Sequence, residues 1–236
     1  MRKIFYLVAI LGTMTIAFAS CGKDDNGETR KLPSKITTSE GTHTWVETFE
    51  YDDLNRLIKT SWVSGNSTGG FEFFYEGSSN RPTRWNFRDN EYSSENALTF
   101  SGNLIINSSD TLVTNANGHL IEWRQGESRA VYEYNSHGDI TKITWNETDE
   151  IIFSYSNEKA IFGHVNIPSW LTIWALDGFH FLARAYMPSV INRGTGSWTF
   201  VYTSSDGYVN KITQTYAMSG ASAETRTMTI EYIDAR

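Results

Sequence analysis

Four tryptophans are the residues of this chain whose type and spacing best suit a binding site. Each follows a turn signal by a few residues and shares its alternating position with other apolar side chains, so all four should lie on one face of a sheet. Aromatic rings on one face can stack against the flat apolar faces of sugars. The alternating positions favour ordinary core instead, because isoleucines and tyrosines share the same face and large aromatic side chains are mostly buried. The four are Trp62, Trp85, Trp123 and Trp145.

No other group of residues has the spacing of a catalytic or metal site. The five histidines include no His-Glu-x-x-His pair, and no Gly-x-Ser-x-Gly elbow or phosphate-binding glycine loop occurs. The acid pairs Asp52-Asp53 and Asp149-Glu150 lie near turns. A glycosidase needs two carboxylates that converge across a pocket, which a sequence cannot show. We therefore predict no catalytic residues, no metal ligands and no cofactor, and we expect a protein that is not an enzyme.

The first 20 residues predict a secretory signal. Arg2 and Lys3 precede an apolar run from Ile4 to Ala19, which is the order of charges and apolar residues in a signal peptide. The run is too short for a permanent membrane span. Removal of residues 1–20 takes two basic residues and no acid, and the formal charge goes from -7 to -9. An acidic surface repels phosphate backbones, so we expect no nucleic-acid partner.

Cys21 is the single cysteine, and it comes directly after Phe18-Ala19-Ser20. This arrangement resembles the bacterial lipobox, which implies a lipid on Cys21 and attachment to a membrane through it. The alternative is an ordinary signal peptide with an unrelated cysteine. Residues 21–32 are polar and predict a flexible tether. Within them, Lys23, Asp24 and Asp25 resemble the export signal of Bacteroidota surface lipoproteins, which implies an outer-membrane protein that faces the cell exterior.

Residues 33–236 repeat one sequence pattern. A strand that ends in apolar-x-Tyr, which we call incoming, leads into a polar turn, and an apolar strand, which we call outgoing, follows the turn. In the outgoing strands one alternating position holds pairs such as Ile58 and Trp62, and the other holds charged residues. One face is therefore aromatic and the other charged, which is typical of an antiparallel sheet packed on one side. We expect Glu50 to pair with Lys59 and Glu133 with Lys142 across hairpins. The tyrosines that end the incoming strands are Tyr51, Tyr75, Tyr134, Tyr155, Tyr202 and Tyr232.

A segment at about 166–188 breaks the strand pattern. It is apolar on most sides between Trp170 and Tyr186, and it predicts one or two short helices that Gly178 interrupts and Pro188 ends. A helix that is apolar all round must be buried. We expect Trp170, Trp174 and Phe181 to pack on the aromatic face. The predicted fold is mainly β: a single-domain curved antiparallel meander, an open half-barrel with this helical insertion on its concave face.

The turn at Tyr51-Asp52-Asp53-Leu54-Asn55-Arg56-Leu57 resembles the YD repeat of Rhs-type proteins, with Asn55 in the place of a glycine. With the lipobox and the late apolar helix, the chain resembles an uncharacterised domain family of Bacteroidota lipoproteins. That resemblance implies fold and location and no chemistry. Three hypotheses remain for function: a non-enzymatic surface lipoprotein that binds a glycan or an envelope protein, a lipid or lipoprotein carrier with an apolar cavity, and a hydrolase with an unrecognised site.

Overall fold

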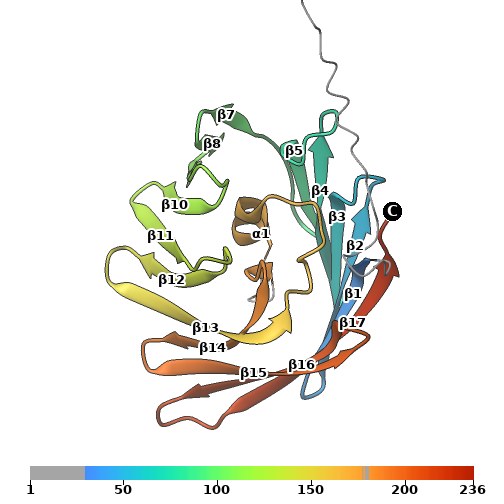
Figure 1. Cartoon of the computed structure of the whole chain (residues 1–236), viewed down its shortest axis with the longest axis vertical. Helices are drawn as coiled ribbons and strands as arrows, with labels where there is room; N and C mark the ends of the chain where they lie inside the picture. The colour runs from blue at the N-terminus through green and yellow to red at the C-terminus, as the bar shows by residue number, and fades with distance from the viewer. Residues whose placement is uncertain (1–29, 177, 179–180) are drawn as a thin grey trace, which may run out of the picture.

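A single antiparallel sheet of 17 strands curves around one short helix (Figure 1). The structure is a computed structural model that describes residues 30–176, 178 and 181–236. The predicted fold class is confirmed. The elements are β1 (Lys31–Glu40), β2 (His43–Tyr51), β3 (Leu57–Ser64), β4 (Ser67–Tyr75), β5 (Pro82–Asp89), β6 (Ser93–Ala97), β7 (Thr99–Ser101), β8 (Leu104–Asn107), β9 (Asp110–Thr114), β10 (Leu120–Gln125), β11 (Ser128–Tyr134), β12 (Ile140–Trp145), β13 (Asp149–Lys159), α1 (Ser169–Ala175), β14 (Tyr186–Arg193), β15 (Gly196–Ser205), β16 (Tyr208–Met218) and β17 (Glu224–Asp234).

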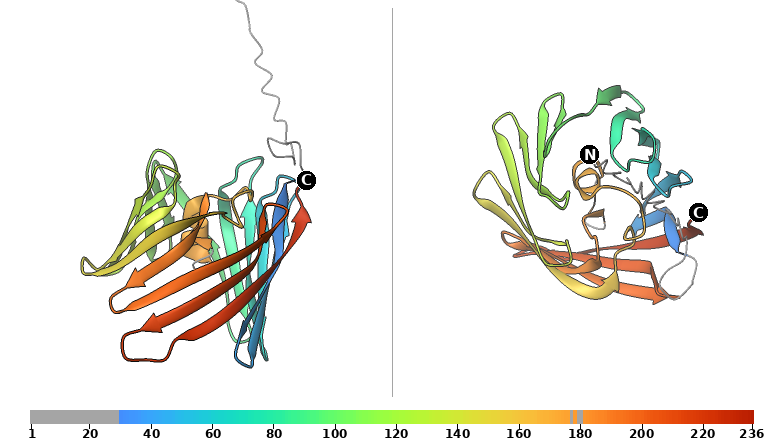
Figure 2. Two further views of the ribbon diagram at one scale, coloured as in Figure 1. Left: turned by 60° about the horizontal axis from the view of Figure 1, so that its bottom comes forward. Right: turned by 45° about the horizontal axis from the view of Figure 1, so that its top comes forward.

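The sheet is a nearly closed, barrel-like meander. Neighbouring strands in the sequence pair with each other, and β1 lies between β2 and β17, so the first and last strands join the ring. Figure 2 shows the strands as a ring around α1. Among the described strands, no ladder joins β6 to β7, where the chain continues through Leu98. We call this place the seam. The sheet thus curves further than a half-barrel and stops short of full closure.

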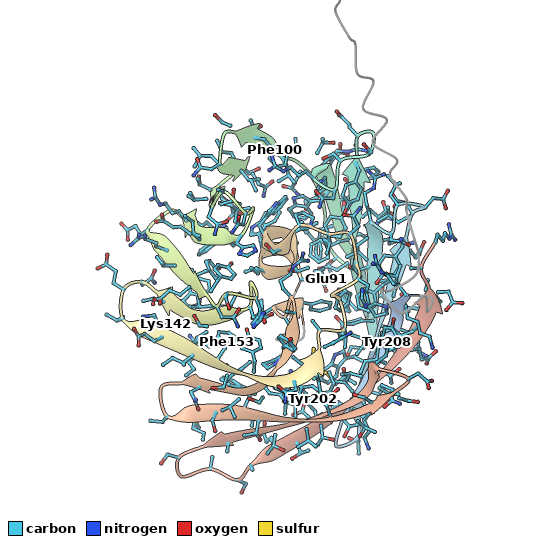
Figure 3. All side chains as sticks on the ribbon, in the orientation of Figure 1. Glu91, Phe100, Lys142, Phe153, Tyr202 and Tyr208 are labelled. Carbon is cyan, nitrogen blue, oxygen red and sulfur yellow. The ribbon has the colours of Figure 1, made fainter. Side chains whose placement is uncertain are left out.

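The two faces of the sheet separate as the alternation predicted. Phe153 on β13 faces inward and is buried, whereas Lys142 on β12 lies on the outer face; both are labelled in Figure 3. Lys142 Nζ lies 2.8 Å from a carboxylate oxygen of Glu133, and Lys59 Nζ lies 3.4 Å from Glu50. Both predicted cross-strand pairs are therefore present. Exposed pairs of this kind contribute up to about 1 kcal/mol each.

The repeated tyrosines have a common structural role. Each donates its hydroxyl hydrogen bond to a backbone carbonyl on an earlier strand, as Tyr75 does to Leu57 O at 2.7 Å and Tyr155 to Ile140 O at 2.6 Å. Each accepting carbonyl belongs to a residue at a shift of strand register, where a bulge takes it out of the regular ladder. The tyrosines therefore supply the hydrogen bond that the bulge removes. The six donor–acceptor pairs are Tyr51–Pro33, Tyr75–Leu57, Tyr134–Leu120, Tyr155–Ile140, Tyr202–Pro188 and Tyr232–Val209.

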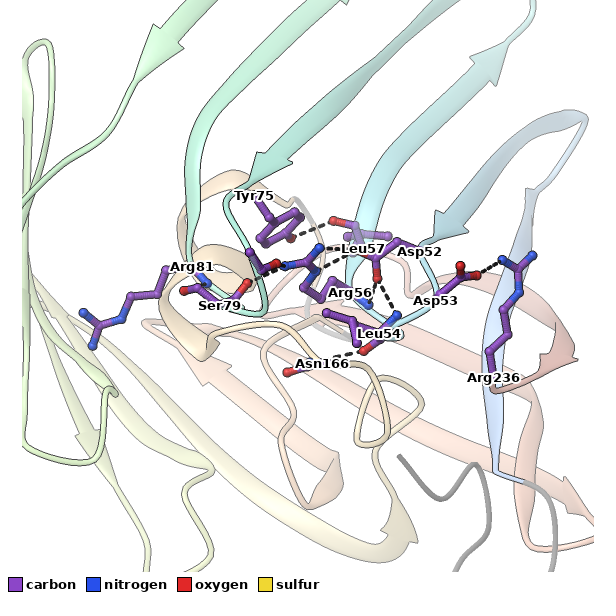
Figure 4. A network of polar contacts seen from close by, with 11 residues as sticks. Asp52, Asp53, Leu54, Arg56, Leu57, Tyr75, Ser79, Arg81, Asn166 and Arg236 are labelled. Atoms are coloured by element: carbon purple, nitrogen blue, oxygen red, sulfur yellow. Dashed lines mark hydrogen bonds and ion pairs between the residues drawn. The ribbon is translucent and has the colours of Figure 1, made fainter. Parts of the chain in front are cut away.

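The polar residue after the tyrosine closes the turn. Asp52 Oδ1 accepts hydrogen bonds from the N–H groups of Leu54 and Arg56, both at 3.0 Å. Asn135 does the same in the turn from β11 to β12. In the first of these turns Asn55 adopts a left-handed φ of 57°, which asparagine tolerates better than most residues. Figure 4 shows this turn, with the Arg56 guanidinium also donating to Ser79 O at 2.7 Å.

The helical insertion is shorter than predicted. Among the described residues α1 covers only Ser169–Ala175, and Pro188 lies inside β14 instead of ending a helix. The reason is tertiary pairing, because β14 hydrogen-bonds to β13 and Pro188 sits opposite Tyr155 at a register shift. A bulge is one of the few strand positions where proline's missing N–H costs nothing.

The insertion fills the inside of the sheet. Trp170 and Leu171 of α1 are almost completely buried. Phe181 lies 5.9 Å from Phe49 of β2 and 4.9 Å from Phe162, between ring centroids. The predicted placement of the insertion on the aromatic face is therefore present in the structure. Within the described part of the chain, no helix is long and apolar enough to cross a membrane.

The two ends of the sheet differ. At one end β1 begins at Lys31 and β17 finishes opposite it at Asp234; we call this the terminal end. The opposite end, the distal end, carries the short turns at 41–42, 65–66, 126–127 and 194–195. Cys21 and the Lys23-Asp24-Asp25 run lie outside the described residues. The first strand starts two residues earlier than the predicted domain start at residue 33.

Candidate functional site

Six of the eight tryptophans come from strands and line the inside of the sheet toward its distal end. Each lies near the middle of its strand or in the half nearer the distal end. Each is partly exposed and not fully buried. The strand alternation that turns Phe49 and Ile143 inward turns these rings inward as well. They are Trp45, Trp62, Trp85, Trp123, Trp145 and Trp198. The other two, Trp170 and Trp174, belong to α1.

A hollow of about 600 Å³ lies on the inner side of the sheet, and we call it the distal cavity. Trp45, Trp62 and Trp145 line it, and two charged side chains, Glu47 and Arg226, lie among them. Its other walls are mixed. The polar ones come from Thr38 and Ser64, and the apolar ones from Tyr132, Ile143, Ile151, Ile173, Leu176, Leu182 and Met228. Aromatic faces beside a few polar groups are the usual composition of a small-ligand site.

The position of the Trp62 ring depends on the residue opposite it on β4. Its register partner on β4 is Gly69, where an added Cβ would lie 2.4 Å from the indole Cζ2. The ring can therefore lie against the backbone of β4 only because the position is glycine. Trp62 is thus partly fixed before any ligand arrives, which reduces the entropy cost of binding.

The polar groups of the distal cavity are also held in place. Arg226 Nε donates a 2.7 Å hydrogen bond to Oε1 of the buried Gln214, and its guanidinium carbon lies 5.7 Å from the centre of the Trp45 ring. Burial raises the pKa of Tyr132 well above its ordinary value, so this hydroxyl stays protonated and neutral. The cavity therefore offers fixed hydrogen-bonding groups beside aromatic faces.

A second hollow of about 400 Å³ lies between β5–β6 and β8–β9, on either side of the seam; we call it the seam pocket. Trp85 and Trp174 line it, with ring centroids 5.4 Å apart and planes at 83°. A narrow cleft of about 140 Å³ is bordered by residues of both hollows, and we call it the linking cleft. This linking cleft shares Glu47, Trp62 and Leu176 with the distal cavity, and it shares Phe71 and Ala175 with the seam pocket.

Comparison with known proteins adds little to this geometry. Neither a protein-family model nor a curated protein matches the chain. Among solved structures it is similar to a porin-like protein from Bacteroides vulgatus ATCC 8482, at 13% sequence identity and a TM-score of 0.43, over 86% of this chain and 99% of that one. A likeness this distant carries no argument about the site.

The structure separates the four tryptophans that the sequence singled out. Trp62 and Trp145 line the distal cavity, and Trp85 lines the seam pocket. Trp123 packs edge-on against Trp145 at 5.3 Å, and its Nε1 donates a 2.9 Å hydrogen bond to Asp110. Trp123 therefore supports the wall from behind Trp145.

Three further site residues were not found from the sequence: Trp45, Glu47 and Arg226. A usable signal existed, because Trp45 and Glu47 share their alternating position with Phe49 and Tyr51, and Arg226 shares one with Tyr232. Continuing each apolar-x-Tyr pattern a few residues upstream would have placed all three on the inner face. Trp174 lies in the predicted insertion, but the contact between its ring and that of Trp85 depends on how α1 packs against β5.

The charged groups of the site are few. In the described ranges, no group of three or more His, Cys, Asp or Glu could hold a metal ion. Glu47 is the one carboxylate among the described residues that line the distal cavity, and Asp110 lines the seam pocket. The arrangement is therefore suited to stacking and hydrogen bonding.

Proposed function

We propose that this protein is a lipid-anchored outer-membrane lipoprotein, facing the cell exterior, that binds a carbohydrate in the distal cavity without cleaving it. The observation that carries the proposal is the set of partly exposed tryptophans, Trp45, Trp62 and Trp145, around a hollow that also holds Glu47 and Arg226. A sugar ring presents an apolar face to an indole and hydroxyls to charged and polar groups. Both kinds of partner are present in this hollow.

The composition of the hollow favours a sugar over an acyl chain. A lipid carrier needs an apolar space, and here the interior is largely filled by the insertion, with Phe162, Ile167 and Trp170 buried. An acyl chain in the distal cavity would also remove water from the charged side chains of Glu47 and Arg226, which costs free energy. Binding without cleavage is the simpler proposal, because the described lining offers one carboxylate where glycoside hydrolysis ordinarily uses two.

The outer face supports attachment through the N-terminal segment. Ion pairs lie on that face at several places around the ring, including Lys35–Glu231 at 2.7 Å and Arg84–Glu95 at 2.5 Å. A sheet that contacts lipid carries an apolar band on its outer face. The ion pairs on the outer face of this sheet are suited to contact with water. The lipid on Cys21 would then hold the protein at the membrane.

The position of the termini gives the site an orientation. Lys31 begins β1 at the terminal end, and Thr38 of the same strand lines the distal cavity. Seven residues of strand separate them, or roughly 23 Å. An anchor before β1 would therefore point the distal cavity away from the membrane, where a glycan outside the cell can reach it.

Glycan-array screening of the mature protein tests the carbohydrate proposal. We expect binding to at least one oligosaccharide class, and Trp62→Ala should weaken it at least tenfold, or ~1.4 kcal/mol, because the stacking platform is removed. Trp198→Phe is the matched control. Trp198 stacks on Tyr216, with ring centroids 4.7 Å apart, and lines neither the distal cavity nor the seam pocket. The Trp198→Phe variant should therefore bind the glycan with wild-type affinity.

Two results of that screen would contradict the proposal. If no glycan binds and a fluorescent fatty acid does, the distal cavity is a lipid site. If a glycan binds and shorter saccharides accumulate on incubation, the protein is a hydrolase.

Metabolic labelling with palmitate tests the anchor. The wild-type protein should take up label and Cys21→Ala should take up none, because the thiol is the acceptor in the proposed lipid attachment. Protease added to intact cells should degrade the wild-type protein. A variant with Lys23, Asp24 and Asp25 changed to alanine should be protected. Equal labelling of both chains rejects the lipid, and equal protection rejects the export signal.

A further inference from the structure

The seam pocket holds hydrogen-bonding atoms that the fold does not use. Trp85 Nε1 and Asn107 Oδ1 are both buried, and neither has a hydrogen-bond partner among the described residues. Asn107 is 4% exposed, and both residues line the pocket. Buried polar groups are ordinarily paired, so two unpaired ones on the walls of one hollow indicate groups kept for a ligand.

The chemistry of these two atoms points to hydroxyl groups. Trp85 Nε1 can only donate a hydrogen bond and Asn107 Oδ1 can only accept one, whereas a hydroxyl does both. A hydroxyl therefore matches the hydrogen-bonding chemistry of both atoms. The ring of Trp174, edge-on to Trp85, and that of Phe87 line the same pocket, and they offer apolar faces for stacking. The seam pocket thus combines aromatic faces with hydrogen-bonding groups, as the distal cavity does.

A smaller cleft with shared lining residues lies between the two hollows. The linking cleft shares Trp62 with the distal cavity and Phe71 with the seam pocket. The strand register sets the distance between Trp62 and Trp85. Trp62 pairs with Gly69 and Gly69 with Asp89, and Trp85 lies four residues before Asp89 on β5. Two strand spacings and four residues of rise correspond to roughly 16 Å, which is further than one sugar ring spans.

We infer that the distal cavity and the seam pocket are two subsites of one groove, and that the ligand is an oligosaccharide long enough to occupy both. This inference rests on the proposed carbohydrate binding and specifies the length of the ligand. Affinity should accordingly depend on chain length. A disaccharide can occupy one subsite, whereas a hexasaccharide of the same linkage can occupy both at once.

Calorimetric titration with matched sugar pairs tests the inference: maltose and maltohexaose, cellobiose and cellohexaose, xylobiose and xylohexaose, and the same two lengths of any class that the array identifies. Wild type should bind one hexasaccharide at least tenfold tighter than its disaccharide. The double variant Trp85→Phe/Asn107→Ala should bind the hexasaccharide at least fivefold more weakly than wild type and leave the disaccharide unchanged. Trp85→Phe keeps an aromatic ring beside Trp174, and a melting temperature within a few degrees of wild type confirms the fold. Trp198→Phe should bind like wild type.

The outcomes separate the two proposals. Hexasaccharide affinity that is unchanged in the double variant overturns the seam subsite, as it would if Trp85 and Asn107 only held water. Equal affinity of wild type for both lengths overturns it too. Either result leaves carbohydrate binding in the distal cavity standing, provided that Trp62→Ala weakens both sugars. If wild type binds none of them, carbohydrate binding and the inference both fail.

Discussion

Trp170→Ala should lower the free energy of unfolding by about 4 kcal/mol, because truncating a buried aromatic side chain costs its transfer free energy and leaves a cavity. Trp170 is 2% exposed. Its ring lies 6.2 Å from Phe100 of β7 and 6.3 Å from Trp174, between centroids. The loss is a large share of the 5–15 kcal/mol that typically stabilises a domain. Urea denaturation followed by far-UV circular dichroism measures it without depending on tryptophan fluorescence.

Trp198→Ala is the matched control for this measurement. Trp198 is partly exposed and stacks on the Tyr216 ring, so truncating its side chain should cost about 1–2 kcal/mol, less than the loss of a fully buried side chain. Equal losses for the two variants would contradict the conclusion that α1 supplies the centre of the core. A Trp170→Ala protein that unfolds like wild type would mean that the helix covers the sheet without stabilising it.

The sequence predicted the insertion at about 166–188 as buried because it is apolar on most sides, but it did not rank the tryptophans within it. Trp170 is in the core, whereas Trp174 is partly exposed and lines the seam pocket against Trp85. That difference depends on where the C-terminal end of a two-turn helix meets β5. No local pattern carries this information, because the two segments are about 90 residues apart in the sequence.

Strand alternation predicted the two faces but not the bulges. Ile58 shares its alternating position with Trp62, yet Leu57, one residue earlier, is the residue with 0% exposure. A register shift between Leu57 and Lys59 changes the alternation there, and the Tyr75 hydroxyl bonds to the Leu57 carbonyl. A bulge is one extra residue in one strand, so it is visible only when both partners of a ladder are known.

The near-closure of the ring could not be predicted from the sequence for a related reason. It depends on the pairing of β1 with β17, in which Lys35 lies opposite Glu231. Contacts between residues so distant in sequence leave no periodic signal in either strand. Half a dozen recognisable hairpins indicated an open half-barrel, because the weaker strands β6 to β9 around the seam lack the tyrosine pattern. The seam pocket, and Asn107 within it, lie in that unpredicted part.

The structural importance of Asp139 could not be expected from the sequence, since the residue follows His137-Gly138 in a turn and resembles an ordinary turn acid. It is 0% exposed. Its Oδ1 accepts hydrogen bonds from the backbone N–H groups of Arg184 at 2.9 Å and Ala185 at 2.7 Å, and from that of Tyr186 at 3.4 Å. The carboxylate therefore holds the chain where it leaves the insertion and enters β14.

The charge of Asp139 has a second effect. Burial lowers the pKa of the Arg184 guanidinium, and the negative charge of Asp139 opposes that shift. Arg184 also donates a 3.2 Å hydrogen bond to the carbonyl of Ile167, just before α1. Removing the carboxylate would leave backbone donors without an acceptor and a buried cation without its counter-charge.

Asp139→Ala should therefore destabilise the protein by about 3–5 kcal/mol, the range found when one partner of a buried charged interaction is removed. Asp139→Asn keeps an acceptor oxygen for the backbone N–H groups, loses the charge and puts an NH2 group in place of the other carboxylate oxygen, so its loss of stability should be smaller than that of Asp139→Ala. The exposed Asp53, which pairs with Arg236 at 2.6 Å, is the control, and Asp53→Ala should cost less than about 1 kcal/mol. Urea denaturation of the three variants measures these losses. If Asp139→Ala unfolds at the same urea concentration as Asp53→Ala, the insertion is held by its apolar contacts alone and Asp139 is only a turn residue.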